Sequence, residues 1–189
     1  MEHDYRSSMA AKLPTPTDSD VRTVLDRQAL VMFELANEVL ADVTLDECLW
    51  RISDQSWTVH ELNGRFVGEL GDEPPDLPTP SLAWTMWHPI WWLSVLIAHA
   101  HGREIPAPES VEWPGPESSV ATIRELWAEW MLFASGLDED DLSSGELSKF
   151  PYTDGRPFVH TIGWASMELV KNLSEMCMLR RIANEVAER

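Results

Sequence analysis

The sequence predicts an all-α fold, a four-helix bundle with long irregular connections. Four stretches repeat apolar residues at three- and four-residue steps, which is the pattern of an amphipathic helix. No stretch reads convincingly as a strand, and the connections are rich in proline and glycine. Because 189 residues fit one domain of ordinary size, we expect a bundle domain over residues 19–189 after a mobile polar tail over residues 1–18.

The first long helix is expected to begin near residue 18 or 19 and to continue to about Val39. Asp18, Ser19 and Asp20 are candidates to cap its amino end, because short polar side chains accept hydrogen bonds from the first free backbone N–H groups. Thr44–Glu47 has the spacing of a capping box and predicts a short helical turn leading into residues 48–50.

The second long helix is expected over residues 81–101, with Gly102 as its carboxyl-terminal stop. The preceding stretch, residues 64–80, is rich in glycine, proline and acidic residues. We expect it to be irregular, because its prolines would break a helix or a central strand.

The third long helix is expected from Ser118 or Ser119 to Ser135, followed by a stop at Gly136. Residues 138–155 read as a loop with one short helical turn. The last long helix is expected from residue 157 or 158 to about residue 188.

Charge excludes one class of partner. The chain has 14 basic and 32 acidic residues, a formal net charge of -18. Nucleic-acid binding depends on basic side chains that neutralise phosphates, so we expect no nucleic-acid partner, and no anionic membrane partner for the same reason. The most apolar stretch, residues 84–100, is interrupted by His88, Pro89 and His99, which argues against a membrane span.

The two cysteines, Cys48 and Cys177, lie in no metal-binding spacing. The first twenty residues lack the apolar core of a secretory signal, so we expect a cytoplasmic protein with reduced thiols. Cys177 follows the polar cluster described next, but a reactive thiol needs electropositive surroundings, which the local sequence offers only at Arg180 and Arg181.

Three polar residues fall on helix faces that should point inward. His88 lies in a stripe of tryptophans on the second long helix. On the last helix, at 100° per residue, Asn172 falls within the apolar face and Glu168 lies one turn earlier at its border. All three could therefore turn toward one interior space, whereas Glu175 should point further out.

Each of these residues also has a purely structural explanation. His88 could bond a backbone carbonyl, Asn172 could bridge two helices, and Glu168 could pair with Lys171, Arg180 or Arg181. Three polar groups in one apolar cavity nevertheless need partners, which a ligand, a metal ion or ordered water would supply.

Two motifs carry a resemblance to a known family. They are Trp84-x-x-Trp-His-x-x-Trp-Trp92 and Trp164-x-x-x-Glu-Leu-x-x-Asn-x-x-Glu-x-x-x-Leu-Arg180. Together with the helix pattern, they resemble the DinB/YfiT-like superfamily over residues 20–185, most closely its actinobacterial-type members. The resemblance implies a four-helix bundle that often forms a homodimer.

The resemblance also implies a divalent-metal site, with zinc or nickel held by one His from the second helix and an H-x-x-x-H pair on the last. Carried over, these positions are His88, Glu168 and Asn172; a second registration places Lys171 and Asn172 on the paired positions. This sequence therefore departs from the family, because one imidazole, one carboxylate and one amide form a weaker site than three imidazoles.

The expected function is that of a transferase or hydrolase that acts on a small molecule in the bundle core. It would depend on a divalent metal or, as in some members, on a low-molecular-weight thiol such as bacillithiol or mycothiol. The alternative is a non-enzymatic small-molecule-binding protein, or a dimeric interaction protein, with a degenerate metal site. The pocket would be lined by Trp84, Trp87, Trp91, Trp113, Trp164 and Glu175.

Overall fold

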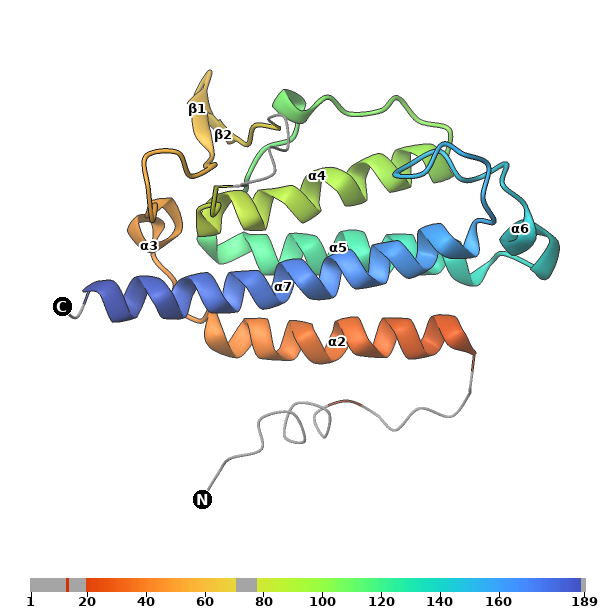
Figure 1. Ribbon diagram of the computed structural model, residues 1–189, viewed down its shortest axis with the longest axis horizontal. Coiled ribbons are helices and arrows are strands. Elements are labelled where there is room, and N and C mark those ends of the chain that lie inside the picture. Colours follow the sequence, from red (N-terminus) through yellow and green to blue (C-terminus); the bar gives the residue numbers. More distant parts are fainter. Residues whose placement is uncertain (1–12, 14–19, 71–77, 188–189) are drawn as a thin grey trace.

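The computed structural model describes residue 13, residues 20–70 and residues 78–187, and these are mostly helical. The long helices are α2 (Val21–Val39), α4 (Leu82–Ala100), α5 (Pro116–Ser135) and α7 (Val159–Ala187). They run alongside one another, α2 packing on α7 and α5, and α4 packing on α5 and α7 (Figure 1). The prediction of a mainly helical fold is confirmed. The tail predicted over residues 1–18 lies outside the described residues apart from Leu13.

The helix ends follow from local chemistry. Asp20 caps α2 by accepting a hydrogen bond from the backbone N–H of Arg22, and Ser81 caps α4 in the same way through Trp84. The other two candidate caps of α2, residues 18 and 19, lie outside the described residues. Helix α5 begins at Pro116, earlier than predicted, because proline has no N–H to leave unpaired in the first helical turn.

The prediction of no strand was wrong. His60–Leu62 (β1) and Arg65–Val67 (β2) form an antiparallel hairpin in which His60 lies opposite Val67. Asn63 and Gly64 connect them with φ angles of 54° and 78°, which these two residue types tolerate best. The Asn-Gly pair was the signal for this hairpin in the sequence. Because β2 ends at Val67, the irregular stretch that was expected from residue 64 begins only after β2. Residues 71–77 of that stretch lie outside the described residues.

Short elements complete the described chain. The predicted capping box opens α3 (Leu45–Leu49), with hydrogen bonds in both directions between Thr44 and Glu47. The predicted turn after α5 is α6 (Glu139–Ser143), and a 3-10 turn, η1, covers Pro108–Ser110. Among the helices described, none has both the length and the hydropathy to cross a bilayer.

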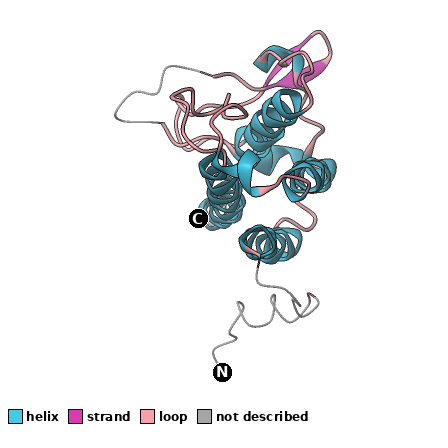
Figure 2. Cartoon of the chain, turned by 90° about the vertical axis from the view of Figure 1, so that its right-hand side faces the viewer, coloured by secondary structure: helices cyan, strands magenta, loops and turns pink. Residues whose placement is uncertain are grey.

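Figure 2 shows the long helices in the turned view. Aromatic side chains fill the core between them. The largest side chains with almost no exposed surface are Trp87, Trp92, Trp127, Trp130 and Phe33. Helix α4 is buried on most of its circumference, since α5 and α7 pack on it and the chain after β2 also reaches it. At Gly68 a Cβ atom would lie 2.1 Å from the ring of Trp87, so only glycine allows this close approach.

Candidate polar site between α4 and α7

His88 lies on α4 between two tryptophan rings. Its imidazole stacks on Trp84, with ring centroids 4.7 Å apart and planes 11° apart, and it lies 6.1 Å from the ring of Trp91. The residue is half-buried, yet its Nδ1 atom is fully buried and has no hydrogen-bond partner among the described residues. The imidazole therefore keeps one unused hydrogen-bonding position.

The surroundings keep His88 neutral. The pKa of His88 is lowered to about 4, chiefly by burial and then by the positive charge of Lys171, while a hydrogen bond with the Asn172 side chain acts in the opposite direction. Because both α7 residues act on the imidazole, His88 lies close to the polar face of α7. At neutral pH the ring carries no charge and can donate from one nitrogen and accept at the other.

Asn172 connects the two helices. Its Oδ1 accepts a hydrogen bond from Nε1 of Trp92 on α4 at 3.1 Å, and its Nδ2 donates to Oε2 of Glu175 at 3.3 Å. Nδ2 also lies 3.5 Å from Oε1 of Glu168. The residue is 1% exposed, so the alternative of a buried amide that bridges helices describes its contacts well.

Glu168 is a nearly buried carboxylate, 8% exposed, and it is paired with a lysine. Nζ of Lys171 lies 2.6 Å from its Oε1. Of the three cations that the sequence left open, Lys171 is thus a partner of Glu168. Arg180 instead donates to the carbonyl oxygens of Val39 and Ala41 and pairs with Glu47.

Glu175 lies further out than Glu168 and Asn172, but it still belongs to the polar cluster. Its carboxylate accepts from Asn172, three residues earlier on the same helix, and the side chain is half-buried. Residues three apart on a helix are neighbours, so the hydrogen bond turns the side chain inward.

The predicted tryptophans pack into a chain of rings around this cluster. Trp91 contacts Phe150 with ring centroids 5.9 Å apart, Phe150 contacts Trp164 at 5.6 Å, and Trp164 contacts Trp92 at 5.2 Å. Phe150, from the loop before α7, was missed by the sequence analysis, because it belongs to no periodic pattern.

Two other predicted tryptophans are tied to the chain that covers α4. Trp87 donates from Nε1 to the carbonyl of Val111, and Trp113 packs edge-on against Phe66 of β2. The Nε1 atoms of Trp91 and Trp113 are buried without a hydrogen-bond partner among the described residues. Trp91 therefore adds a free donor beside His88.

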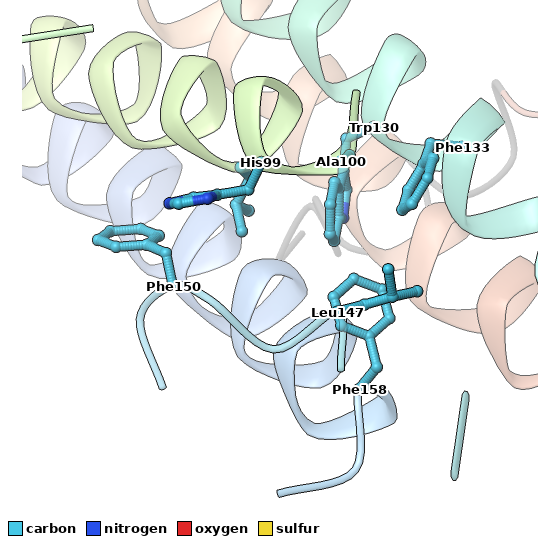
Figure 3. A pocket seen from close by; sticks show the side chains of 8 residues that line it. His99, Ala100, Trp130, Phe133, Leu147, Phe150 and Phe158 are labelled. Atoms are coloured by element: carbon cyan, nitrogen blue, oxygen red, sulfur yellow. The ribbon is translucent and has the colours of Figure 1, made fainter. Parts of the chain in front are cut away.

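Two hollows lie away from His88. One, of about 10 Å³, is enclosed by the rings of Trp130, Phe133 and Phe158 and by His99 and Phe150 (Figure 3). It has room for about one water molecule. The other, of about 700 Å³, is a surface hollow beside the carboxyl end of α2 and the start of α5. Neither is lined by His88, Glu168 or Asn172, so the core pocket around them stays a prediction.

The cysteines have the properties of buried structural thiols. Burial raises the pKa of Cys177 to about 11, and burial together with Glu47 raises that of Cys48 to about 12. Both are protonated at neutral pH, so neither supplies the thiolate that nucleophilic chemistry needs.

The donor groups do not fit a zinc or nickel site of three imidazoles. Only His88 supplies a nitrogen, the oxygen of Asn172 already accepts from Trp92, and the carboxylate of Glu168 is in contact with an ammonium group. Within the described residues, no group of three His, Cys, Asp or Glu side chains is placed to hold an ion. The predicted set His88, Glu168 and Asn172 lies together, but its chemistry is poor for a borderline-soft ion.

Comparison with known proteins identifies the family. The family model described as DinB superfamily matches residues 67–176, which include α4, α5 and most of α7. A comparison with curated proteins gives no match. The matched region contains the whole polar site and more than half of the sequence, and the chain belongs to the DinB superfamily.

Proposed function

We propose that this protein binds a small polar molecule between α4 and α7 of a four-helix bundle, at a degenerate metal site. The observation that carries the proposal is the buried Nδ1 of His88, which has no hydrogen-bond partner in the described chain. A buried polar atom without a partner costs about 1–3 kcal/mol. A ligand that reaches this nitrogen would recover that free energy.

The free groups indicate which ligand chemistry fits. The neutral imidazole of His88 can accept or donate, and the indole N–H of Trp91 can only donate. The ring faces of Trp84 and Trp91 flank the imidazole. We therefore propose a ligand with a hydroxyl, amide or similar group that both donates and accepts, attached to a flat apolar portion.

The whole-chain charge supports a small molecule rather than a polyanion as partner. At a formal net charge of -18, the average field repels nucleic acid and anionic lipid. The cytoplasmic location, the homodimer and the single domain over residues 19–189 stay predictions.

A second candidate is the metal- or thiol-dependent transferase or hydrolase that the family resemblance implies. The unpartnered Nδ1 of His88 favours it, because a histidine ligand must offer a free, unprotonated nitrogen. The ion pair between Lys171 and Glu168 opposes it, so we rank it second.

The proposal is tested by a ligand screen followed by one substitution. Small alcohols, amides and aromatic acids are screened for binding to the full chain by ligand-observed NMR. We expect H88A to weaken the binding of the best ligand at least about tenfold, equivalent to about 1.4 kcal/mol, because the hydrogen bond to the imidazole is lost.

The matched control is H160A, which removes an exposed histidine near the start of α7. It should bind the same ligand as the unmodified protein does. Equal affinity of H88A and H160A, with both proteins folded, would contradict the proposed site.

A further inference from the structure

The ammonium group of Lys171 lies beside Glu168, one of the predicted metal-binding residues. Nζ of Lys171 lies 2.6 Å from Oε1 of Glu168, a carboxylate whose side chain is 10% exposed. A carboxylate with so little contact with water needs a nearby positive charge or several hydrogen-bond donors. Lys171 supplies that charge from a position that is itself about half exposed, at the edge of the site.

The orientation of Asn172 fits a site organised around this ion pair. Its oxygen faces the N–H of Trp92, which can only donate, so its NH₂ group must face Glu168 and Glu175. A metal ion between positions 168 and 172 would require the oxygen to turn the other way. The amide is thus set to donate to carboxylates rather than to coordinate an ion.

We propose that the ammonium group of Lys171 is the resident cation of this site and occupies it in place of a divalent ion. An ion bound to Glu168 would have to displace Nζ from Oε1, or remain within a few ångströms of another positive charge, and repulsion disfavours the second arrangement. The charge of Lys171 also reaches His88, since it contributes to lowering the pKa of that imidazole. Lys171 is therefore a residue that determines what the site accepts.

This inference goes beyond the proposed function, because it concerns which cation the site holds and not which organic ligand binds. Lys171 then opposes a divalent ion in addition to the amide of Asn172, whose oxygen already accepts from Trp92. Once position 172 offers a metal ligand, removing the lysine should therefore strengthen metal binding.

The test restores one family ligand and then removes the lysine. N172H adds a second imidazole beside His88 and Glu168, giving two nitrogens and one carboxylate, a set that zinc accepts in proteins. Zn²⁺ binding to the tag-free full chain is measured by calorimetry for N172H, N172H/K171A and N172H/K149A. The last is the matched control, because Lys149 is an exposed lysine outside this cluster.

We expect N172H/K171A to bind Zn²⁺ at least about tenfold more tightly than N172H, since Glu168 becomes free to coordinate. N172H/K149A should bind as N172H does. Equal affinities for N172H and N172H/K171A would overturn the inference.

Because Asn172 is almost fully buried, N172H could fail to fold, and a second variant keeps the inference testable. N172D keeps the shape of the asparagine and adds a carboxylate beside His88 and Glu168, and carboxylates are zinc ligands in proteins. We expect Zn²⁺ to raise the Tm of N172D/K171A by more than it raises the Tm of N172D. Equal Tm responses of the two variants to Zn²⁺ would contradict the inference.

These outcomes are distinct from failure of the proposed function. If the zinc experiments fail while H88A weakens the binding of an organic ligand as expected, only the role of Lys171 is wrong. If the zinc experiments succeed and no organic ligand depends on His88, only the proposed function is wrong.

Discussion

At the residue scale, the protonation state of His88 links the site to the stability of the fold. The imidazole is held between two indole rings and close to the charge of Lys171, and its pKa falls to about 4. In the unfolded chain the same group has an ordinary pKa of about 6.5. Folding therefore favours the neutral form, and acid should act against the fold at this residue.

The pH dependence follows from that difference. Between about pH 6.5 and about pH 4 the unfolded state binds a proton that the folded state does not, so the free energy of unfolding falls as pH falls. The full loss from this residue is about 3 kcal/mol, reached near pH 4. The measurement is urea unfolding at about pH 7 and at about pH 5. Between these pH values the free energy of unfolding should decrease by about 2 kcal/mol more in the unmodified protein than in H88Q.

The comparison with H88Q matters because carboxylates throughout this acidic chain also titrate. The glutamine keeps polar groups near the imidazole's position but does not titrate. If the decreases for the two proteins are equal, His88 has an ordinary pKa and the description of its surroundings is wrong.

At the element scale, one arginine of α7 joins three helices. Arg180 donates to the carbonyl oxygens of Val39 and Ala41 at the carboxyl end of α2, and its Nε lies 3.2 Å from Oε1 of Glu47 in α3. Helix ends leave carbonyl groups without intrahelical partners, so this side chain satisfies groups that would otherwise need water. It sets the position of α2 against the last helix.

We therefore expect R180M to reduce the free energy of unfolding by about 2 kcal/mol, because the hydrogen bonds of a charged group to α2 and to Glu47 are lost. The neighbouring Arg181 is exposed and is the matched control. R181M should change the stability by less than about 0.5 kcal/mol in the same urea experiment. Similar losses in the two variants would show that Arg180 contributes no more than a surface charge.

Most of the helices could be predicted from the sequence, whereas the strands could not. The long helices follow from apolar spacing and capping residues, and their observed ends agree with prediction to within about three residues. The hairpin was missed because its strands have three residues each, too short for an alternating pattern to stand out. Asn63-Gly64 was its only strong local signal.

At the scale of the whole molecule, periodicity could place the site but not its internal contacts. Helical spacing put His88, Glu168 and Asn172 on inward faces, and the structure brings them together. It could not choose among three possible cations for Glu168, because long flexible side chains are oriented by tertiary surroundings. Nor could it foresee Phe150, which comes from a loop and reaches the cluster only after α7 has packed.

The central claim is that this site holds polar groups, and Lys171 as its cation, in place of a bound divalent ion. Elemental analysis of the tag-free protein as purified, alongside H88A, tests that claim most directly. We predict zinc and nickel far below one equivalent per chain, with no difference between the two proteins. One equivalent of either metal in the unmodified protein, lost in a folded H88A, would contradict the account.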